Sequence, residues 1–228
     1  MLTVKLSIMK KRKLLITGCG RSGTFYSSEV WRRLGLDVRH ERPIAHHGVM
    51  GEDGAASWLM AVNDPNPPFG PSAVDYEFDV VIHQVRHPLK VIASVAQFIL
   101  AKGQFAKDYI ERNVPQIKII GDELSLSREQ QFVLQAARYW YYWNMISQEK
   151  ATVTVQVERL SRDLANLCEL MNVEYQRTKL DDIPPKINGR QYYLNEELWT
   201  VDWRDLEGLD FELTERIRNL AAGYGYDF

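Results

Sequence analysis

The feature that most restricts the fold of this chain is a glycine-rich segment, TGCGRSGT, at Thr17–Thr24. The apolar run Leu14–Ile16 precedes it and predicts a buried strand, while the residues from about 24 to 34 predict a helix that Gly35 ends. A glycine loop between a strand and the start of a helix gathers backbone amides and the positive end of the helix dipole around one point. The segment therefore predicts an anion-binding loop in an α/β protein.

Strand and helix patterns continue to alternate along the chain. A short strand is expected around Asp37–Arg39, and DVVIHQV, at Asp79–Val85, has the continuous apolar character of a strand in a parallel sheet. Pro88 suits the first turn of a helix that reaches about residue 102. We therefore expect a three-layer α/β/α fold with a mostly parallel central sheet, of the P-loop-like type, with ligands at the carboxyl ends of the strands.

The second half of the chain fits the same plan. Ser127 and Gln130 predict a capping box for a helix over residues 128–148, and TVTVQV, at Thr152–Val157, predicts a strand. A helix capped by Ser161 is expected to follow as far as Met171, and a last amphipathic helix over residues 213–222. Nothing marks a linker between domains, so residues 1–228 are expected to form one domain.

Residues 42–78 interrupt this alternation. The segment is rich in glycine and proline, which break helices, so we expect a surface excursion with at most a short helix within residues 55–62. His46, His47, Glu52 and Asp53 lie there, and each is more simply interpreted as a solvated loop residue than as a catalytic one. The adjacent histidines lack the spacing of a metal site, and no metal is expected.

Composition narrows the range of partners. The chain has 28 Lys and Arg against 30 Asp and Glu, a net charge of −2, which gives no global reason to expect nucleic acid as a partner. Cys19 and Cys168 are too few for a disulfide framework, and no signal sequence or membrane-spanning segment is evident. A cytoplasmic protein is expected. Translation could start at Met1 or at Met9, since the residues between them predict no element.

The loop differs from that of ATP- and GTP-hydrolysing proteins. In the pattern GxxxxGK[ST], Thr24 takes the place of the lysine and Phe25 that of the magnesium-binding hydroxyl. Transfer of a sulfuryl group can proceed without a divalent metal, if cations and amides neutralise the leaving phosphate. Arg21 stands where it can do so. A small-molecule kinase that uses ATP and Mg²⁺, or a non-catalytic nucleotide-binding protein, remains the alternative.

Two motifs resemble those of the sulfotransferase family, whose donor is 3′-phosphoadenosine 5′-phosphosulfate (PAPS). The first is Arg21-Ser22-Gly23-Thr24, similar to the family's 5′-phosphosulfate loop. The second is Arg86, at a strand end, with Ser94 eight residues later, similar to the family's pair for the 3′-phosphate. VERLSRDLANLCELMNV is a third, looser similarity, and the resemblance spans about residues 14–173. It implies that residues 14–34 and 79–102 hold PAPS, with Gly20 contributing to the phosphate loop.

The resemblance has departures. Better-known members have lysine where Arg21 stands and an adenine-stacking tryptophan where Tyr26 stands, although arginine remains cationic and tyrosine keeps an aromatic face. Their carboxy-terminal loop for the 3′-phosphate is not evident, and Lys186 or Arg190 is a candidate for its role.

The resemblance also suggests where a catalytic base lies. Carbohydrate-acting members often use a glutamate just beyond the second strand, which is where Glu41 stands, and His40 beside it is the residue type used by aryl and alcohol sulfotransferases. We favour Glu41, and we expect only one of the two to face the cleft if the segment is extended. The acceptor, a small molecule or carbohydrate or a peptide tyrosine, is not identified, and neither is the oligomeric state. The aromatic run RYWYYWN, at Arg138–Asn144, is expected to form core.

Overall fold

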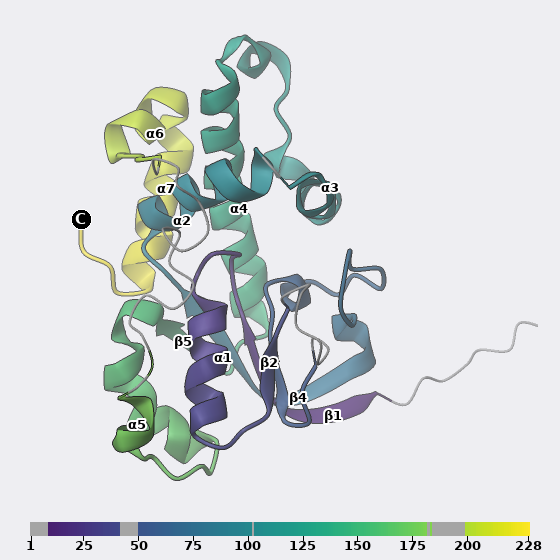
Figure 1. Cartoon of the computed structure of the whole chain (residues 1–228). Coiled ribbons are helices and arrows are strands. Elements are labelled where there is room, and N and C mark those ends of the chain that lie inside the picture. Colours follow the sequence, from purple (N-terminus) through teal and green to yellow (C-terminus); the bar gives the residue numbers. More distant parts are fainter. Residues whose placement is uncertain (1–8, 42–49, 102, 182, 184–198) are drawn as a thin grey trace, which may run out of the picture.

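The computed structural model describes residues 9–41, 50–101, 103–181, 183 and 199–228 (Figure 1). Its centre is a five-stranded sheet in the order β2-β3-β1-β4-β5, and every neighbouring pair of strands is parallel. The strands are β1 (Lys10–Thr17), β2 (Val38–His40), β3 (Gly54–Ala56), β4 (Tyr76–Val85) and β5 (Val153–Gln156). Because the strands are all parallel, their carboxyl ends lie at one edge of the sheet, where ligands bind in folds of this kind.

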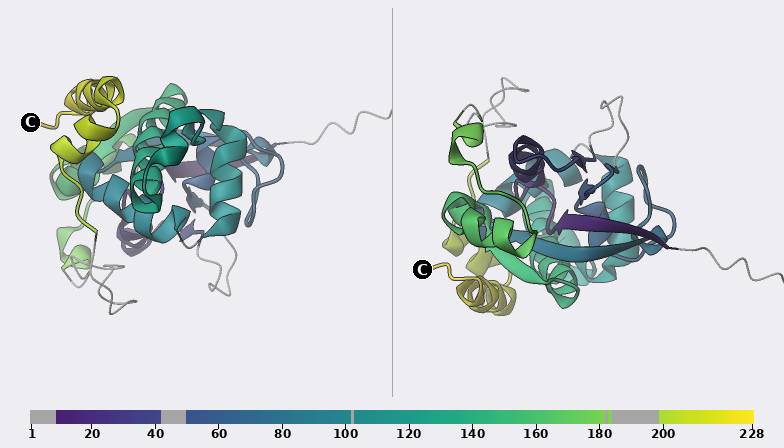
Figure 2. Two further views of the ribbon diagram at one scale, coloured as in Figure 1. Left: turned by 90° about the horizontal axis from the view of Figure 1, so that it is seen from above. Right: turned by 90° about the horizontal axis from the view of Figure 1, so that it is seen from below.

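Helices cover both faces of the sheet, which gives three layers (Figures 1 and 2). One face carries α1 (Thr24–Arg33) and α5 (Leu160–Leu170). The other long helical elements pack together on the other side of the sheet. They are α2 (Pro88–Val95), a π-helical turn (Ala96–Leu100), α3 (Gln104–Asn113), α4 (Arg128–Glu149), α6 (Trp203–Leu209) and α7 (Phe211–Gly223). The predicted three-layer α/β/α fold is confirmed.

Burial of apolar side chains explains the two interfaces. Leu14 and Ile16 of β1 meet Trp31 of α1 and Leu164 of α5 in one buried cluster. Alternate residues of a strand point to opposite faces, so Leu15 belongs to a different cluster, with Ala55. The larger helical cluster has Trp140 and Trp143 of α4 at its centre, both with no exposed surface, as the sequence predicted for the aromatic run.

The excursion predicted at residues 42–78 contains a strand that the sequence did not reveal. β3 lies between β1 and β2 and pairs with both, and only a 3-10 turn, Leu59–Ala61, stands where a short helix was expected. A side chain at Gly54 would begin 1.8 Å from the carbonyl oxygen of Leu14, so only glycine fits there. The sequence GAA lacks the β-branched residues that signal a strand, because this strand is fully buried where space is small.

Several boundaries also differ from those predicted. β4 begins at Tyr76 rather than residue 79, and the helix after Pro88 is α-helical only to Val95 before the π-helical turn. α5 begins at Leu160 without a side-chain cap, so Ser161 lies inside it. α6 was not predicted, although Asp202 and Asp205 form its capping box. The capping box of Ser127 and Gln130 on α4 is confirmed.

In the part of the chain that the structure describes, no single helix is both long and apolar enough to cross a membrane. The bent pair Pro88–Leu100 and Gln104–Asn113 meets the length and composition requirement only when joined across a 117° bend. Cys19 and Cys168 are both buried free thiols.

Candidate functional site

The glycine loop joins β1 to α1 in a left-handed backbone turn. Arg21 has a φ of 73° and Gly23 a φ of 96°, the region that glycine adopts at least cost. The amide of Ser27 donates to the carbonyl of Gly23 at 3.2 Å, the first hydrogen bond of the helix. The amides of the first turn of α1 precede its hydrogen-bond ladder and lie at the positive end of its dipole, whereas the amide of Ser22 donates to the carbonyl of Cys19 at 3.1 Å. The backbone thus has the geometry of an anion-binding loop.

Gln84, near the end of β4, fixes this loop through two side-chain hydrogen bonds. Its side-chain amide donates to the carbonyl of Ser22 at 2.9 Å, and its carbonyl oxygen accepts from the hydroxyl of Ser27. The side chain is buried, and both of its polar ends are therefore satisfied by the loop and helix that follow β1. Sequence reasoning missed Gln84, although a polar residue in a buried apolar strand was a signal.

Tyr139 of α4 also contacts the loop. The amide of Gly20 donates to its hydroxyl oxygen at 2.8 Å. Burial raises the pKa of Tyr139, so the phenol stays neutral. The family resemblance implied that Gly20 helps to bind PAPS, but its amide already donates to a side chain of the protein. Tyr139 was predicted only as part of the core.

The two predicted anion-binding corners meet. The Nε atom of Arg21 donates to the hydroxyl of Ser94 on α2 at 2.9 Å, and Nη1 of Arg86 donates to the carbonyl of Arg21 at 3.3 Å. The guanidinium of Arg21 also lies 5.8 Å from the ring centre of Phe98. Residues from separate strand-to-helix corners therefore form one cluster.

The other predicted loop residues lie in different surroundings. Ser22 is fully buried, and its hydroxyl has no hydrogen-bond partner among the residues described. The hydroxyl of Thr24 lies 3.1 Å from Nε2 of His40, which links the loop to the end of β2. Tyr26 is half-buried against the cluster that contains Trp31, and its role as an adenine platform stays a prediction.

The two candidate bases lie together. β2 ends at His40, so the alternation expected of an extended segment does not continue to Glu41, and Nε2 of His40 is 3.8 Å from Oε1 of Glu41. Both side chains are largely buried, Glu41 the more so, and which of the two faces the cleft stays a prediction.

Glu41 has the most perturbed carboxyl of the site. Burial raises its pKa to about 8, and the Ser57 hydroxyl and the amides of Trp58 and Leu59 offset this only in part. Ser57 directly follows β3, so its position depends on the strand that sequence reasoning missed. A carboxyl with a pKa near neutral pH, close to the glycine loop through His40 and Thr24, is a candidate for proton transfer.

The second corner is tied to the carboxy-terminal segment. The backbone amide of His87 donates to Oε1 of Glu158 at 3.1 Å, and the hydroxyl of Tyr226 donates to Oε2 at 2.8 Å. The ring of His87 also packs edge-on against Tyr226 and Phe228. Burial lowers the pKa of His87, which favours its neutral form.

Some candidates from the sequence cannot be placed or lie elsewhere. Lys186, Arg190, His46 and His47 fall outside the described residues. Asp53 pairs with Lys13 at 2.8 Å and accepts from the amide of Asp37, so it acts in the fold. The residues described include no group of three His, Cys, Asp or Glu side chains that could hold a metal ion.

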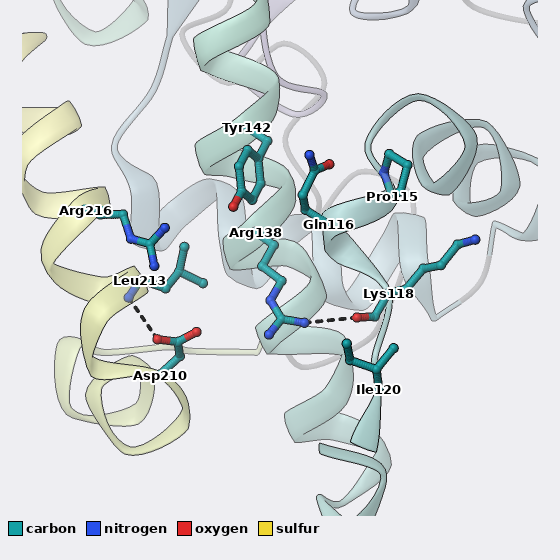
Figure 3. A pocket seen from close by; sticks show the side chains of 9 residues that line it. All are labelled: Pro115, Gln116, Lys118, Ile120, Arg138, Tyr142, Asp210, Leu213 and Arg216. Carbon is teal, nitrogen blue, oxygen red and sulfur yellow. Dashed lines mark hydrogen bonds between the residues drawn. The ribbon is translucent and has the colours of Figure 1, made fainter. Parts of the chain in front are cut away.

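Two hollows on the helical side of the molecule are separate from this site. The smaller, of about 300 Å³, lies among α4, α7 and the segment before α4, and Figure 3 shows its lining residues. Arg138 there donates to the carbonyl of Lys118 at 3.0 Å and pairs with Glu123, so its charge is compensated. The second, of about 430 Å³, adjoins it through Lys118. Neither is lined by a residue of the two corners.

Comparison of the chain with protein-family models, with curated proteins and with solved structures finds no match. The class that the fold defines is that of three-layer α/β proteins with an all-parallel sheet. Any more particular function depends on the residues of the site.

Proposed function

We propose that this chain is a PAPS-dependent sulfotransferase that acts on a hydroxyl group of a small molecule or carbohydrate. The observation that carries the proposal is the contact of Arg21 with Ser94 and of Arg86 with the backbone of Arg21. PAPS has phosphate groups on both sides of its ribose and therefore needs two neighbouring anion sites. The residues that resemble the sulfotransferase motifs form two such corners side by side.

Each part of the cluster has a task in this reaction. The amides of the first turn of α1 and the guanidinium of Arg21 bind the 5′-phosphate and neutralise the charge that it gains on leaving. Arg86 and Ser94 bind the 3′-phosphate. The acceptor oxygen forms a bond to sulfur as the bond between sulfur and the bridging phosphate oxygen breaks, and adenosine 3′,5′-bisphosphate is released.

Glu41 takes the proton of the acceptor hydroxyl. A pKa of about 8 makes its carboxylate a stronger base than an ordinary glutamate, while a useful fraction is still ionised at neutral pH. His40 lies between Glu41 and Thr24 and is the alternative base, since either side chain can reach the same region.

The kinase alternative is less favoured by the same geometry. Phe25, in the place of a magnesium-binding hydroxyl, packs edge-on against the ring of His40 with 5.3 Å between their centres. An aromatic side chain there supplies no oxygen ligand for Mg²⁺. A non-catalytic nucleotide-binding protein would keep the loop but would not need a buried carboxyl with a raised pKa.

Calorimetry followed by an acceptor screen tests the proposal. Adenosine 3′,5′-bisphosphate is expected to bind without Mg²⁺, and incubation with PAPS is expected to add about 80 Da to an acceptor in a mixture of sugars, alcohols and tyrosine peptides. Binding of ATP with Mg²⁺ in preference to the bisphosphate would support a kinase. Binding of the bisphosphate with no transfer to any acceptor class would support the non-catalytic protein.

A further inference from the structure

Two arginines stand at the carboxyl ends of neighbouring strands. β4 and β5 are parallel, and their register pairs Val85 with Gln156, so Arg86 directly follows one strand while Arg159 lies in the turn after the other. Strands paired in this way are about 4.8 Å apart. The two residues therefore begin from adjacent points on the edge of the sheet where the ligand is expected.

Neither arginine is neutralised by a carboxylate in the part of the chain that the structure describes. Arg86 is half-buried and donates to a backbone carbonyl, and Arg159 is exposed and forms no ion pair with a described residue. Glu158, next to Arg159, instead accepts from the His87 amide and the Tyr226 hydroxyl. The edge thus carries two arginines that form no ion pair with a described residue, while the nearby carboxylate of Glu158 is engaged by two neutral donors.

The carboxy-terminal segment lies near both of these arginines. Tyr226 contacts His87, the residue after Arg86, with 5.5 Å between ring centres. Nη1 of Arg159 lies 3.6 Å from where a Cβ atom on Gly225 would be, the residue before Tyr226. Burial and Glu158 raise the pKa of Tyr226, and the charges of Arg86 and Arg159 offset this rise only in part.

We infer that Arg159 is a second binding residue for the 3′-phosphate, opposite Arg86, and that it supplies the cation for which the sequence offered only Lys186 or Arg190. The inference rests on the proposed function. A phosphate dianion between two guanidinium groups is held more strongly and more selectively than by one, because each group donates charge-assisted hydrogen bonds. The nucleotide's 5′-phosphate, bound at the glycine loop, does not depend on Arg159.

The test compares two nucleotides by calorimetry. In Arg159→Gln, adenosine 3′,5′-bisphosphate is expected to bind about tenfold more weakly, while adenosine 5′-monophosphate changes by less than about twofold. Arg159→Lys keeps a charge and is expected to retain most of the affinity. The matched control is Arg162→Gln, since Arg162 is an exposed arginine of the same segment that pairs with Asp163, and it is expected to leave both affinities unchanged.

The outcomes separate the inference from the function on which it rests. Unchanged bisphosphate affinity in Arg159→Gln, or an equal loss for both nucleotides, overturns the role of Arg159 and leaves the sulfotransferase proposal standing. A wild-type protein that does not bind the bisphosphate overturns the proposed function and this inference with it. Melting temperatures of the free variants, expected to match the wild type because Arg159 is exposed, exclude a folding defect.

Discussion

Arg86 is the residue at which the 3′-phosphate assignment is most directly tested. Arg86→Ala removes a charge-assisted hydrogen bond worth about 1.5–3 kcal/mol and should weaken adenosine 3′,5′-bisphosphate by roughly one to two orders of magnitude. Binding of adenosine 5′-monophosphate, measured by the same calorimetry, should barely change. Arg86 also donates to the carbonyl of Arg21, so an equal loss for both nucleotides would show that it only supports the loop.

Glu41 decides how the acceptor is activated. Glu41→Gln keeps the shape of the side chain but removes its basicity, so turnover is expected to fall roughly 10²–10⁴-fold with unchanged bisphosphate affinity. In the wild type, turnover should rise with pH until the carboxyl is ionised, near pH 8. His40→Asn is the comparison, and it is expected to cost much less. A larger loss in His40→Asn, with Glu41→Gln still active, would assign the base to the histidine.

The same carboxyl predicts a pH dependence of stability that needs no acceptor. The pKa of Glu41 is raised on folding from an ordinary value near 4.5 to about 8, so the folded state holds a proton that the unfolded state releases. Its contribution to stability is therefore full at low pH and is lost as pH rises through 8. Glutamine mimics the protonated form, so the free energy of unfolding of wild type relative to Glu41→Gln should fall between about pH 5 and 9 in urea titrations.

Residues within a local motif could be predicted from the sequence, and residues that act through tertiary contacts could not. Arg21, Arg86 and Ser94 belong to short patterns with fixed spacing, and the structure brings them together. Tyr139 reaches the amide of Gly20 from 119 residues away, on a helix whose aromatic run predicts core and nothing more. Ser57 stands beside Glu41 only because a three-residue strand precedes it.

At the scale of elements, the strain in the glycine loop can be tested by comparing Gly23→Ala with Gly35→Ala, a glycine substitution at the end of the same helix. Ala at Gly23 must adopt a φ of 96° and place its Cβ 2.9 Å from a methyl group of Val157, whereas Ala at Gly35 must adopt a φ of 100° in open space. Gly35→Ala should cost about 1–2 kcal/mol in unfolding free energy, and Gly23→Ala about 2–4 kcal/mol, because only the latter also overpacks. Urea denaturation measures both. Equal losses would mean that Val157 moves aside at no cost.

A strand could be predicted where its residues formed an apolar or β-branched run, and it was missed where they did not. β4 and β5 consist of long or β-branched apolar runs, and both were recognised. β3 is GAA, a sequence without β propensity, and it is a strand because a crowded position between β1 and β2 admits only small residues. The order of the sheet could not be derived without it.

At the scale of the whole molecule, ligand binding should stabilise the fold, since both proposed anion corners and the β1–β4 pair between them belong to one sheet. A ligand at a hundred times its dissociation constant adds about 2.7 kcal/mol to the free energy of unfolding. For a chain of this size, that corresponds to a rise in melting temperature of roughly 5–10 °C. We expect adenosine 3′,5′-bisphosphate to produce this rise in differential scanning fluorimetry with EDTA present, because in the proposed site side-chain cations and amides bind the phosphates and no metal is needed. Under the same conditions, Arg86→Ala should lose most of the shift while keeping the melting temperature of the free protein. A shift seen only with ATP and Mg²⁺ would contradict the metal-free site and favour phosphoryl transfer.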